Sequence, residues 1–246
     1  MDHRELFTCK SADYSAYRPS YPAEAVEWIC ERCHAGTVVD IGAGTGIFTK
    51  CLRGKFLEII AIEPNRDMRA VFLRNLPGIT CIDSCGEDTS LPDQSVNLIT
   101  VAQAFHWLDE DRFKAEAKRI LKPDGKVALI WNNSLKNEFT IALNEVCKEF
   151  CPRFRSGHAG KRSVEEGDLF LLKEYFQQVE NAAFSNPFKM DKSAFLGNMR
   201  SRSYSLIPGD ENFSSFTRCL ESVFEKFSKD GFVTDHQETK VYLGTF

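Results

Sequence analysis

Residues 39–46 read Val-Asp-Ile-Gly-Ala-Gly-Thr-Gly, and this stretch decides the fold. The run from Thr37 to Ile41 is short, apolar and rich in β-branched residues, and it leads directly into glycines. Such a run predicts a buried strand. Glycines let the backbone turn tightly and approach a ligand without a Cβ atom in the way. The stretch therefore predicts a strand that ends in a ligand-binding loop.

Helix and strand patterns alternate on both sides of this loop. Apolar periodicity, caps and turn residues predict helices at 21–34, 47–53, 65–74 and 109–121. Strands are expected at 37–41, 56–62, 79–82, 95–101 and 126–131. This order predicts an α/β fold with a mostly parallel sheet and helices on both faces.

The pattern becomes largely helical after residue 131. We expect helices at 138–151, 165–177, 191–203 and 211–228, and strands at 178–184 and 240–246. These elements predict one domain spanning residues 1–246. Its core is expected at about 21–131, 178–186 and 240–246, and a helical lid over the strand ends at about 132–177 and 187–230.

Charge and hydropathy exclude several classes of protein. The chain has 31 Lys and Arg residues against 35 Asp and Glu residues, a formal net charge of −4. Nucleic-acid binders usually gather basic residues on one face, so we expect no nucleic-acid partner. No apolar run approaches the roughly 20 residues that a membrane helix needs. The N-terminus lacks the apolar core of a signal peptide. We therefore expect a cytoplasmic protein that does not bind membranes.

Cysteines are numerous but do not form a recognisable framework. The count of nine is odd, and the residues are spread along the chain, which does not indicate disulfides. The run Cys30-Glu31-Arg32-Cys33-His34 matches a haem-attachment pattern and offers three metal ligands. No export signal and no second ligand pair at zinc-finger spacing accompany it. We expect no bound metal.

The glycine loop suits a cationic ligand better than a dinucleotide. A dinucleotide fingerprint requires a third glycine where this chain has Ile47. A carboxylate at Asp40 would repel a pyrophosphate but would attract an ammonium or sulfonium group. Glu63 follows the second strand 21 positions after Gly42, a separation at which an acid accepts hydrogen bonds from ribose hydroxyls.

Several motifs occur together over about residues 12–131, and in this order they resemble class I S-adenosylmethionine-dependent methyltransferases. The motifs are VDIGAGTG at 39–46, IEPN at 62–65, CGED at 85–88 with LPD at 91–93, the segment 99–107 and RILKPDG at 119–125. Cys85 and Asn97 depart from the family pattern, which often has Asp at both places. The segment 14–22 and the last strand resemble the branch of trans-aconitate-type and other small-molecule methyltransferases.

The resemblance implies a Rossmann-like sheet of seven mostly parallel strands with an antiparallel last strand and helical lid insertions. It implies S-adenosylmethionine as cofactor and S-adenosylhomocysteine as product. The residues expected to bind the cofactor are Tyr17, Arg18, Asp40, Gly42, Ala43, Gly44, Glu63, Pro64, Met68, Gly86, Glu87, Ala102 and Gln103.

The acceptor is expected to be a small molecule, with a carboxylate as one candidate. A carboxylate needs no general base, whereas a hydroxyl or amine does, and His106 is then the candidate catalytic base. The residues expected to contact the acceptor are Tyr14, Trp107, Trp131, Arg202 and Tyr204, with Arg200 nearby. Arg18 would pair with the carboxylate of the cofactor.

Other interpretations fit less well. A dehydrogenase would have a glycine at position 47 and no acid at position 40. An enzyme that methylates nucleic-acid amines would have Asn or Asp, two prolines and an aromatic residue where this chain has Ala-Gln-Ala-Phe at 102–105. A cofactor-binding sensor without turnover remains an alternative. We expect a monomer or a weak homodimer.

Overall fold

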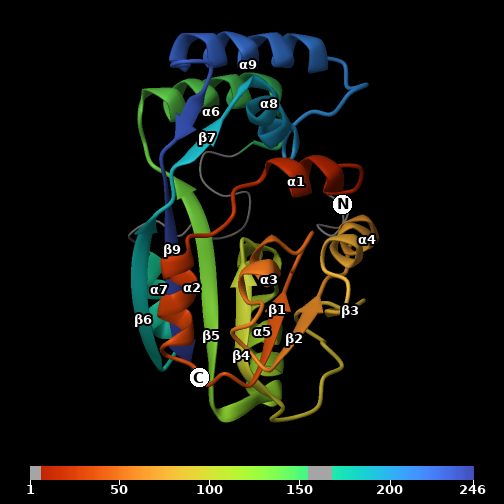
Figure 1. The fold of residues 1–246 in the computed structure, drawn as a ribbon, viewed down its shortest axis with the longest axis vertical. Coiled ribbons are helices and arrows are strands. Elements are labelled where there is room, and N and C mark those ends of the chain that lie inside the picture. Colours follow the sequence, from red (N-terminus) through yellow and green to blue (C-terminus); the bar gives the residue numbers. More distant parts are fainter. Residues whose placement is uncertain (1–6, 155–167) are drawn as a thin grey trace.

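Five strands expected before residue 131 lie side by side in one sheet (Figure 1). The computed structural model describes residues 7–154 and 168–246, with side chains in the second range described from residue 172 onward. The parallel strands are β1 (Thr37–Ile41), β2 (Glu58–Ile62), β3 (Thr80–Ile82), β4 (Val96–Ala102) and β5 (Leu121–Ser134). Because these strands are parallel, their carboxyl ends meet at one edge of the sheet.

The last strand of the chain lies inside the sheet and not at its edge. β9 (Gln237–Thr245) pairs antiparallel with both β5 and β6 (Gln178–Ser185), so the strand order is β3-β2-β1-β4-β5-β9-β6. This arrangement confirms the prediction of seven mostly parallel strands with an antiparallel last strand. β5 is longer than expected, because it begins at Leu121 and continues three residues beyond Trp131.

Helices cover both faces of the sheet. α5 (Glu110–Ile120) and α7 (Asp168–Tyr175) contribute to the apolar cluster on one face. The other face is covered by α2 (Ala23–Cys30), α3 (Ile47–Cys51) and α4 (Arg66–Asn75). Capping side chains start α4 and α5, since Asn65 accepts from the backbone N–H of Met68 and Asp109 from that of Arg112.

A second apolar core lies beyond the carboxyl ends of the strands. It is built by α6 (Glu138–Phe150), α8 (Lys192–Arg200), α9 (Phe213–Phe227) and a two-stranded ribbon of β7 (Phe188–Met190) and β8 (Val233–Asp235). We call these elements the lid. The lid stacks on the sheet end-on, at the top of Figure 1.

The expected boundaries of the lid differ from those observed. α7 packs on the sheet through Leu172, Tyr175 and Phe176, whereas the sequence analysis placed residues 132–177 in the lid. Residues 132–134 likewise belong to β5. The expected helix at 165–177 is observed from Asp168 to Tyr175, and residues 165–167 lie outside the described part of the chain. The β7–β8 ribbon was not predicted.

A short N-terminal helix, α1 (Ser11–Tyr17), lies between the lid and the sheet (Figure 1). The Nζ atom of Lys10, the residue before α1, donates to the carbonyl oxygens of Arg202 at 2.7 Å and Ser205 at 2.8 Å. Asp13 pairs with Arg200 of α8, with 2.8 Å between Oδ2 and Nε. These polar contacts join the N-terminal segment to the lid above the strand ends.

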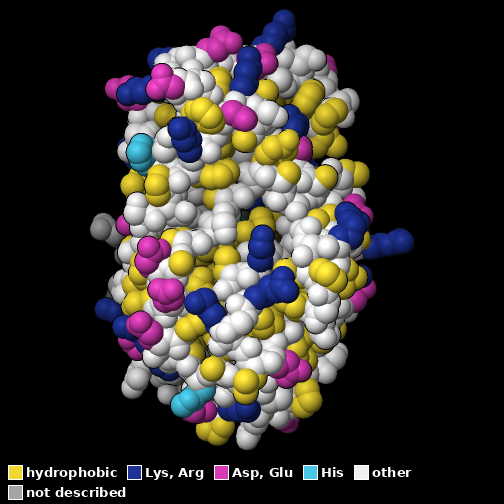
Figure 2. All heavy atoms as spheres, in the orientation of Figure 1, with side chains coloured by type: hydrophobic (Ala, Val, Ile, Leu, Met, Phe, Trp, Pro, Cys, Tyr) yellow, Lys and Arg dark blue, Asp and Glu magenta, His cyan; other side chains and the backbone are white. Residues whose placement is uncertain are grey.

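The surface offers no extended region of one charge on the side that Figure 2 shows, where acidic and basic side chains are interspersed. Among the helices of the described residues, none is both long enough and apolar enough to cross a bilayer.

Candidate ligand-binding site at the strand ends

A cavity of about 370 Å³ opens at the carboxyl ends of β1, β2 and β4. We call it the large cavity. Its walls come from the segments after β1, β2, β3 and β4, from α4 and α5, and from α1 with the segment before it. The lining residues are Phe7, Tyr14, Ile41, Gly42, Gly44, Glu63, Pro64, Asn65, Met68, Cys85, Gly86, Glu87, Ala102, Gln103, Ala104, Trp107, Leu108 and Arg112. Its volume lies within the range of small-molecule sites, roughly 300–1,000 Å³.

Gly42 makes the turn that opens this cavity. Its φ of +66° lies in the left-handed region, and a Cβ atom added there would lie 2.5 Å from the Cβ of Ala104. Both the conformation and the close approach require glycine. The backbone N–H groups of Gly42 and Ala43 donate to the Ile62 carbonyl at 2.9 and 3.1 Å, which fixes the loop to the end of β2.

Glu63 presents a buried carboxylate to the large cavity. The residue is 6% exposed, and its two oxygens accept from the backbone N–H of Gly44 at 2.7 Å and of Asn65 at 2.8 Å. Burial raises the pKa of Glu63 above its usual value, while the two backbone hydrogen bonds oppose that rise. Each carboxylate oxygen keeps a further lone pair, so Glu63 can still accept hydrogen bonds from a ligand.

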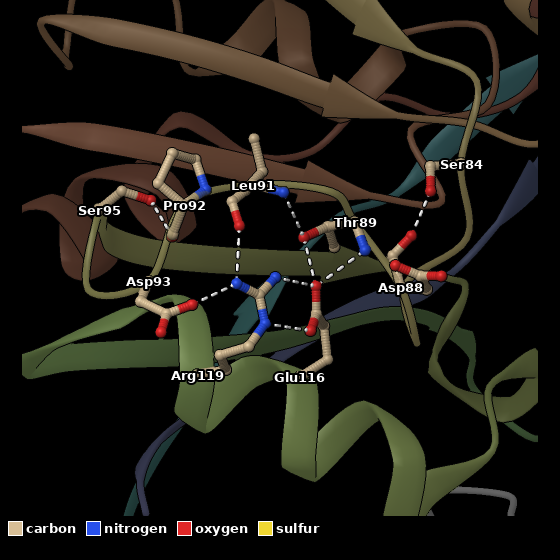
Figure 3. Close-up of polar contacts among 9 residues, drawn as sticks. All are labelled: Ser84, Asp88, Thr89, Leu91, Pro92, Asp93, Ser95, Glu116 and Arg119. Carbon is tan, nitrogen blue, oxygen red and sulfur yellow. Dashed lines mark hydrogen bonds and ion pairs between the residues drawn. The ribbon is translucent and has the colours of Figure 1, made fainter.

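Cys85, Gly86 and Glu87 form one wall of the large cavity, and the chain that follows them is held at Thr89 by Glu116 of α5 (Figure 3). Glu116 Oε1 accepts from the backbone N–H of Thr89 at 2.8 Å and from its hydroxyl at 2.6 Å. Both oxygens of Glu116 also accept from Arg119 at 2.8 Å. The hydrogen bonds from Arg119, opposed by burial and assisted by those from Thr89, lower the pKa of Glu116 to about 2.

A smaller cavity adjoins the large one, and Tyr14, Gly42, Ala102 and Gln103 line both. We call it the small cavity. Its remaining walls come from the end of the N-terminal segment, the glycine loop, α3 and the end of β5. The other lining residues are Arg18, Pro19, Tyr21, Asp40, Ala43, Ile47, Phe48 and Asn132. A guanidinium and a carboxylate therefore border the same space.

Asp40 is fixed by two hydroxyl groups. Its Oδ2 accepts from Thr49 at 2.5 Å and its Oδ1 accepts from Thr100 at 2.8 Å, and the residue is 1% exposed. Burial raises the pKa of Asp40 to about 6, against the opposing effect of these two hydrogen bonds. Near neutral pH this carboxylate is charged and held rigidly behind the glycine loop.

The backbone conformation of Gln103 is a further indication of a functional site, separate from the two cavities. Its φ of +57° is left-handed, which is uncommon for a residue other than glycine. Its backbone N–H donates to Ile130 at 2.9 Å, and its side-chain Nε2 donates to the Asn132 carbonyl at 3.1 Å. Strain of this kind gathers at functional sites, and Gln103 lies at the boundary of both cavities.

The structure brings together most residues expected at the cofactor. Twelve of them line the large cavity, the small cavity or both: Arg18, Asp40, Gly42, Ala43, Gly44, Glu63, Pro64, Met68, Gly86, Glu87, Ala102 and Gln103. Tyr17 does not line either cavity. Its ring packs so closely on Gly197 of α8 that a Cβ atom on that glycine would lie 2.1 Å away, so Tyr17 joins α1 to the lid.

Two residues expected at the acceptor lie elsewhere. Trp131 is 1% exposed and packs between Phe105 and Tyr242, with ring centroids at 6.2 and 5.9 Å, so it belongs to the core of the sheet. His106, the expected base, is half-buried in the short helix η2 (Phe105–Trp107), with its ring 4.6 Å from that of Trp107. Trp107 lines the large cavity, whereas His106 lines neither cavity.

The two arginines expected near the acceptor, Arg200 and Arg202, lie in different surroundings. Arg200 is engaged by Asp13 at the α1–α8 contact, away from both cavities. Arg202 lies in the loop after α8, where its Nη1 donates to the Tyr204 hydroxyl at 2.8 Å. The Tyr204 ring stands 4.9 Å from that of Phe154. Arg202 and Tyr204 thus lie under the lid and line neither cavity.

Other lining residues carry no sequence signal for a ligand, among them Phe7, Tyr21 and Asn132. Tyr21 lies just before Pro22, at the beginning of the first expected helix, and the sequence pattern gives no indication that its side chain contacts a ligand. Phe7 lies 5.6 Å from Tyr14 and 6.3 Å from Trp107 between ring centroids, which is a tertiary contact without a local signal.

Metal-ligating residues are not grouped in the part of the chain that the structure describes, where no three His, Cys, Asp or Glu side chains are arranged to hold an ion. Cys30 and Cys33 are half-buried in the helix α2 and the turn after it. Burial raises the pKa of Cys33 to about 11, so this thiol stays protonated at neutral pH.

Comparison with known proteins gives consistent results. A family model described as a methyltransferase domain matches residues 39–129. A Dictyostelium discoideum protein named as a methyltransferase is 35% identical over 203 residues, which cover 78% of this chain and 74% of that protein. A Mycobacterium tuberculosis protein, named as an uncharacterized methyltransferase, is 40% identical over 119 residues. That match covers 48% of this chain, and the chain spans about half the length of such mycobacterial relatives.

Among solved structures, a type II methyltransferase from Anaeromyxobacter dehalogenans superimposes with a TM-score of 0.69. The match covers 93% of this chain and 98% of the other at 24% sequence identity. At this identity the likeness shows the fold, and it extends through the sheet and the lid together.

Proposed function

The chain belongs to the methyltransferase family, and from this premise we propose that it transfers a methyl group from S-adenosylmethionine to a small-molecule acceptor. The observation that carries the proposal is the large cavity at the ends of β1, β2 and β4, which the Gly42 turn and the neighbouring Glu63 carboxylate both line. Small ligands bind at this place in open parallel sheets.

The large cavity fits the nucleoside part of the cofactor. Glu63 offers free lone pairs for the two ribose hydroxyls. The loop 85–87, Met68 and Leu108 provide a mostly apolar wall for a purine ring. Two carboxylates, Asp40 and Glu63, border the cavities at the glycine loop, and they disfavour a pyrophosphate in the same place.

The small cavity holds only about 30 Å³, but the charges around it mark the side on which we place the amino-acid end of the cofactor. Arg18 and Asp40 place opposite charges around it. A guanidinium binds a carboxylate through charge-assisted hydrogen bonds, and a carboxylate attracts an ammonium group. We propose that Arg18 holds the carboxylate and that the field of Asp40 favours the ammonium and the sulfonium.

When bound, S-adenosylmethionine supplies a methyl group that is already activated by the positive charge on sulfur. The chain contributes by positioning the acceptor and the methyl group relative to each other. The ends of β1 and β4 hold the site, and Tyr14 of α1 lines both cavities and helps to exclude water from them. Positioning of this kind lowers a reaction barrier by about 7–11 kcal/mol.

We propose an acceptor that reacts as an anion. A carboxylate acceptor forms its O–CH3 bond with its own lone pair, while the C–S bond breaks and leaves its electron pair on sulfur. The products are an uncharged ester and S-adenosylhomocysteine, and no proton has to be removed. His106 lines neither cavity, which favours this route, and it stays our prediction for the base only if the acceptor is a hydroxyl or amine.

Isothermal titration calorimetry with S-adenosylhomocysteine tests the cofactor assignment. We expect one site per chain and no detectable binding of NAD. Glu63→Gln should weaken binding at least tenfold, about 1.4 kcal/mol, because an amide offers half the acceptor capacity of a carboxylate. Glu24→Gln, an exposed position on α2, makes the same chemical change outside the site and should bind as the wild type does. Binding of NAD in place of S-adenosylhomocysteine would refute the proposal.

A further inference from the structure

The boundary between the two cavities is formed by the residues that line both of them, namely Tyr14, Gly42, Ala102 and Gln103. In the proposed function, the nucleoside occupies the large cavity and the amino-acid end lies on the side of the small one. The sulfonium group joins these two parts of the cofactor, so it has to lie at this boundary. The side chains of the boundary are therefore the ones that face the sulfur and its methyl group.

Tyr14 brings an unused polar group to this boundary. Gly42 and Ala102 have no polar side chain, and Gln103 directs its amide nitrogen to the Asn132 carbonyl at 3.1 Å. The hydroxyl of the half-buried Tyr14 forms no hydrogen bond with any residue that the structure describes. A tyrosine hydroxyl away from bulk water usually has a partner, so this one is available to a ligand.

The position of Tyr14 relative to the glycine loop is fixed by α4. Asn75 Nδ2 donates to the hydroxyl of Ser15, the next residue in α1, at 3.0 Å and to the Thr45 carbonyl of the loop at 2.9 Å. A Cβ atom added to Gly44 would lie 3.9 Å from Tyr14 Cε1, so the ring packs against the same loop. Tyr14 is thus held where the loop meets both cavities.

The Tyr14 hydroxyl is uncharged at neutral pH. Burial raises the pKa of Tyr14, Arg18 opposes that rise, and Glu63 adds to it. A neutral phenol oxygen keeps lone pairs that can accept a hydrogen bond. The Arg18 guanidinium already lies over the ring, with its Cζ atom 5.0 Å from the ring centroid. A second cation on that face would be repelled by Arg18, which leaves the hydroxyl oxygen as the part of Tyr14 that can face a sulfonium.

We propose that the hydroxyl oxygen of Tyr14 contacts the methyl-sulfonium group and distinguishes S-adenosylmethionine from S-adenosylhomocysteine. The oxygen carries partial negative charge, which attracts the positive sulfur and the methyl hydrogens that the sulfur polarises. S-adenosylhomocysteine has no charge on its sulfur, so the same contact does not retain the product. This inference rests on the proposed function, and it adds Tyr14 to the residues that determine cofactor specificity.

Calorimetry on the full chain with three probes tests this contact. The probes are S-adenosylmethionine, S-adenosylhomocysteine and sinefungin, which carries a C–NH2 group in place of the sulfonium S–CH3 group. At neutral pH this amine is an ammonium, and it can donate a charge-assisted hydrogen bond to the phenol oxygen. Tyr14→Phe should weaken the binding of sinefungin about tenfold or more and that of S-adenosylmethionine about threefold. The affinity for S-adenosylhomocysteine should stay within about twofold of the wild-type value, which also shows that the variant is folded.

Tyr17→Phe is the matched control, because it removes a hydroxyl from the same helix but outside both cavities. It should bind all three probes as the wild type does. Equal weakening of all three probes by Tyr14→Phe, or weakening of none, would overturn the role of Tyr14 and leave the proposed function standing. Failure of the wild type to bind S-adenosylmethionine and S-adenosylhomocysteine would overturn the proposed function itself.

A crystal structure of the wild-type chain with sinefungin gives a test that does not depend on variants. We expect the sinefungin amine within about 3 Å of the Tyr14 hydroxyl oxygen. An amine that is bound by Gln103 or by water, with the Tyr14 hydroxyl directed elsewhere, would refute the contact.

Discussion

The substitution Glu116→Gln offers the sharpest test of how the wall of the large cavity at residues 85–87 is supported. The carboxylate accepts four hydrogen bonds, two from Thr89 and two from Arg119, and its side chain is 9% exposed. Glutamine keeps the size but brings an NH2 group against these donors. Hydrogen bonds to charged groups contribute about 1.5–3 kcal/mol each, and they are not additive.

The lowered pKa expresses the effect of the same hydrogen bonds as an energy. A fall from 4.5 to about 2 corresponds to about 3 kcal/mol. Because the folded pKa is lowered, this contribution is fully present above about pH 4.5 and is lost as the pH falls toward 2. We therefore expect Glu116→Gln to reduce the free energy of unfolding by about 2–4 kcal/mol between pH 6 and 8.

Chemical denaturation followed by far-ultraviolet circular dichroism measures this difference. Glu27→Gln, at an exposed position of α2, is the matched control and should change the free energy by less than about 0.5 kcal/mol. The gap between wild type and Glu116→Gln should narrow below about pH 4.5. A loss under about 1 kcal/mol at pH 7, or a gap that stays constant down to pH 3, would refute the reasoning. Affinity for S-adenosylhomocysteine should fall too, since the loop 85–87 would lose its support.

Three further outcomes are expected. Burial raises the pKa of Asp40 to about 6, so this carboxylate gains a proton between pH 7 and 5, and wild-type affinity for S-adenosylhomocysteine should fall over that range. In calorimetry, Asp40→Asn should bind about tenfold more weakly than the wild type at pH 7 and should show no such fall. Gly42→Ala should abolish binding of S-adenosylhomocysteine, because the new Cβ atom would lie 2.5 Å from the Cβ atom of Ala104. Adding Ala104→Gly should restore part of the binding. Full binding by the single variant would contradict the close approach. Lys10→Met should accelerate amide hydrogen exchange at residues 201–205, since the Lys10 ammonium binds their carbonyl groups, and unchanged exchange there would show that these bonds do not restrain the loop.

The residues that line the large cavity at the strand ends were predictable because they follow strands directly. The carboxyl ends of β1, β2 and β4 meet at one edge of a parallel sheet. Any residue just after those strands, such as Gly42, Glu63 or Gln103, must therefore lie near the others. Element order alone gives this result, and it needs no knowledge of side-chain packing.

Trp131 shows where such reasoning fails. The sequence pattern ended the fifth strand at this residue, so Trp131 was expected at the edge of the sheet. β5 continues to Ser134, paired with Gln237, and Trp131 is therefore an interior residue of the strand. The length of a strand depends on its partner, and this partner lies more than a hundred residues later in the chain.

The lid was predictable only in outline. Its long helices carry a clear apolar period, but β7 and β8 have three residues each, which is too short for an alternating pattern to be recognised. α1 and Tyr17 acquire their roles through contacts with α8, about 180 residues away. The burial of Asp235 and Gln237 could not be predicted, because isolated polar residues near a strand are usually solvated. Only the fold shows that these two residues are buried.

The position of β9 has a consequence for biosynthesis. Residues 237–245 leave the ribosome after β5 and β6 have done so, yet they occupy the interior of the sheet between these two strands. Until they emerge, both of these strands present unpaired backbone groups to other nascent chains. Stalled translation just before residue 237 should therefore yield an aggregation-prone fragment and not a shortened folded protein, and chaperones that shield strand edges would be needed during that interval.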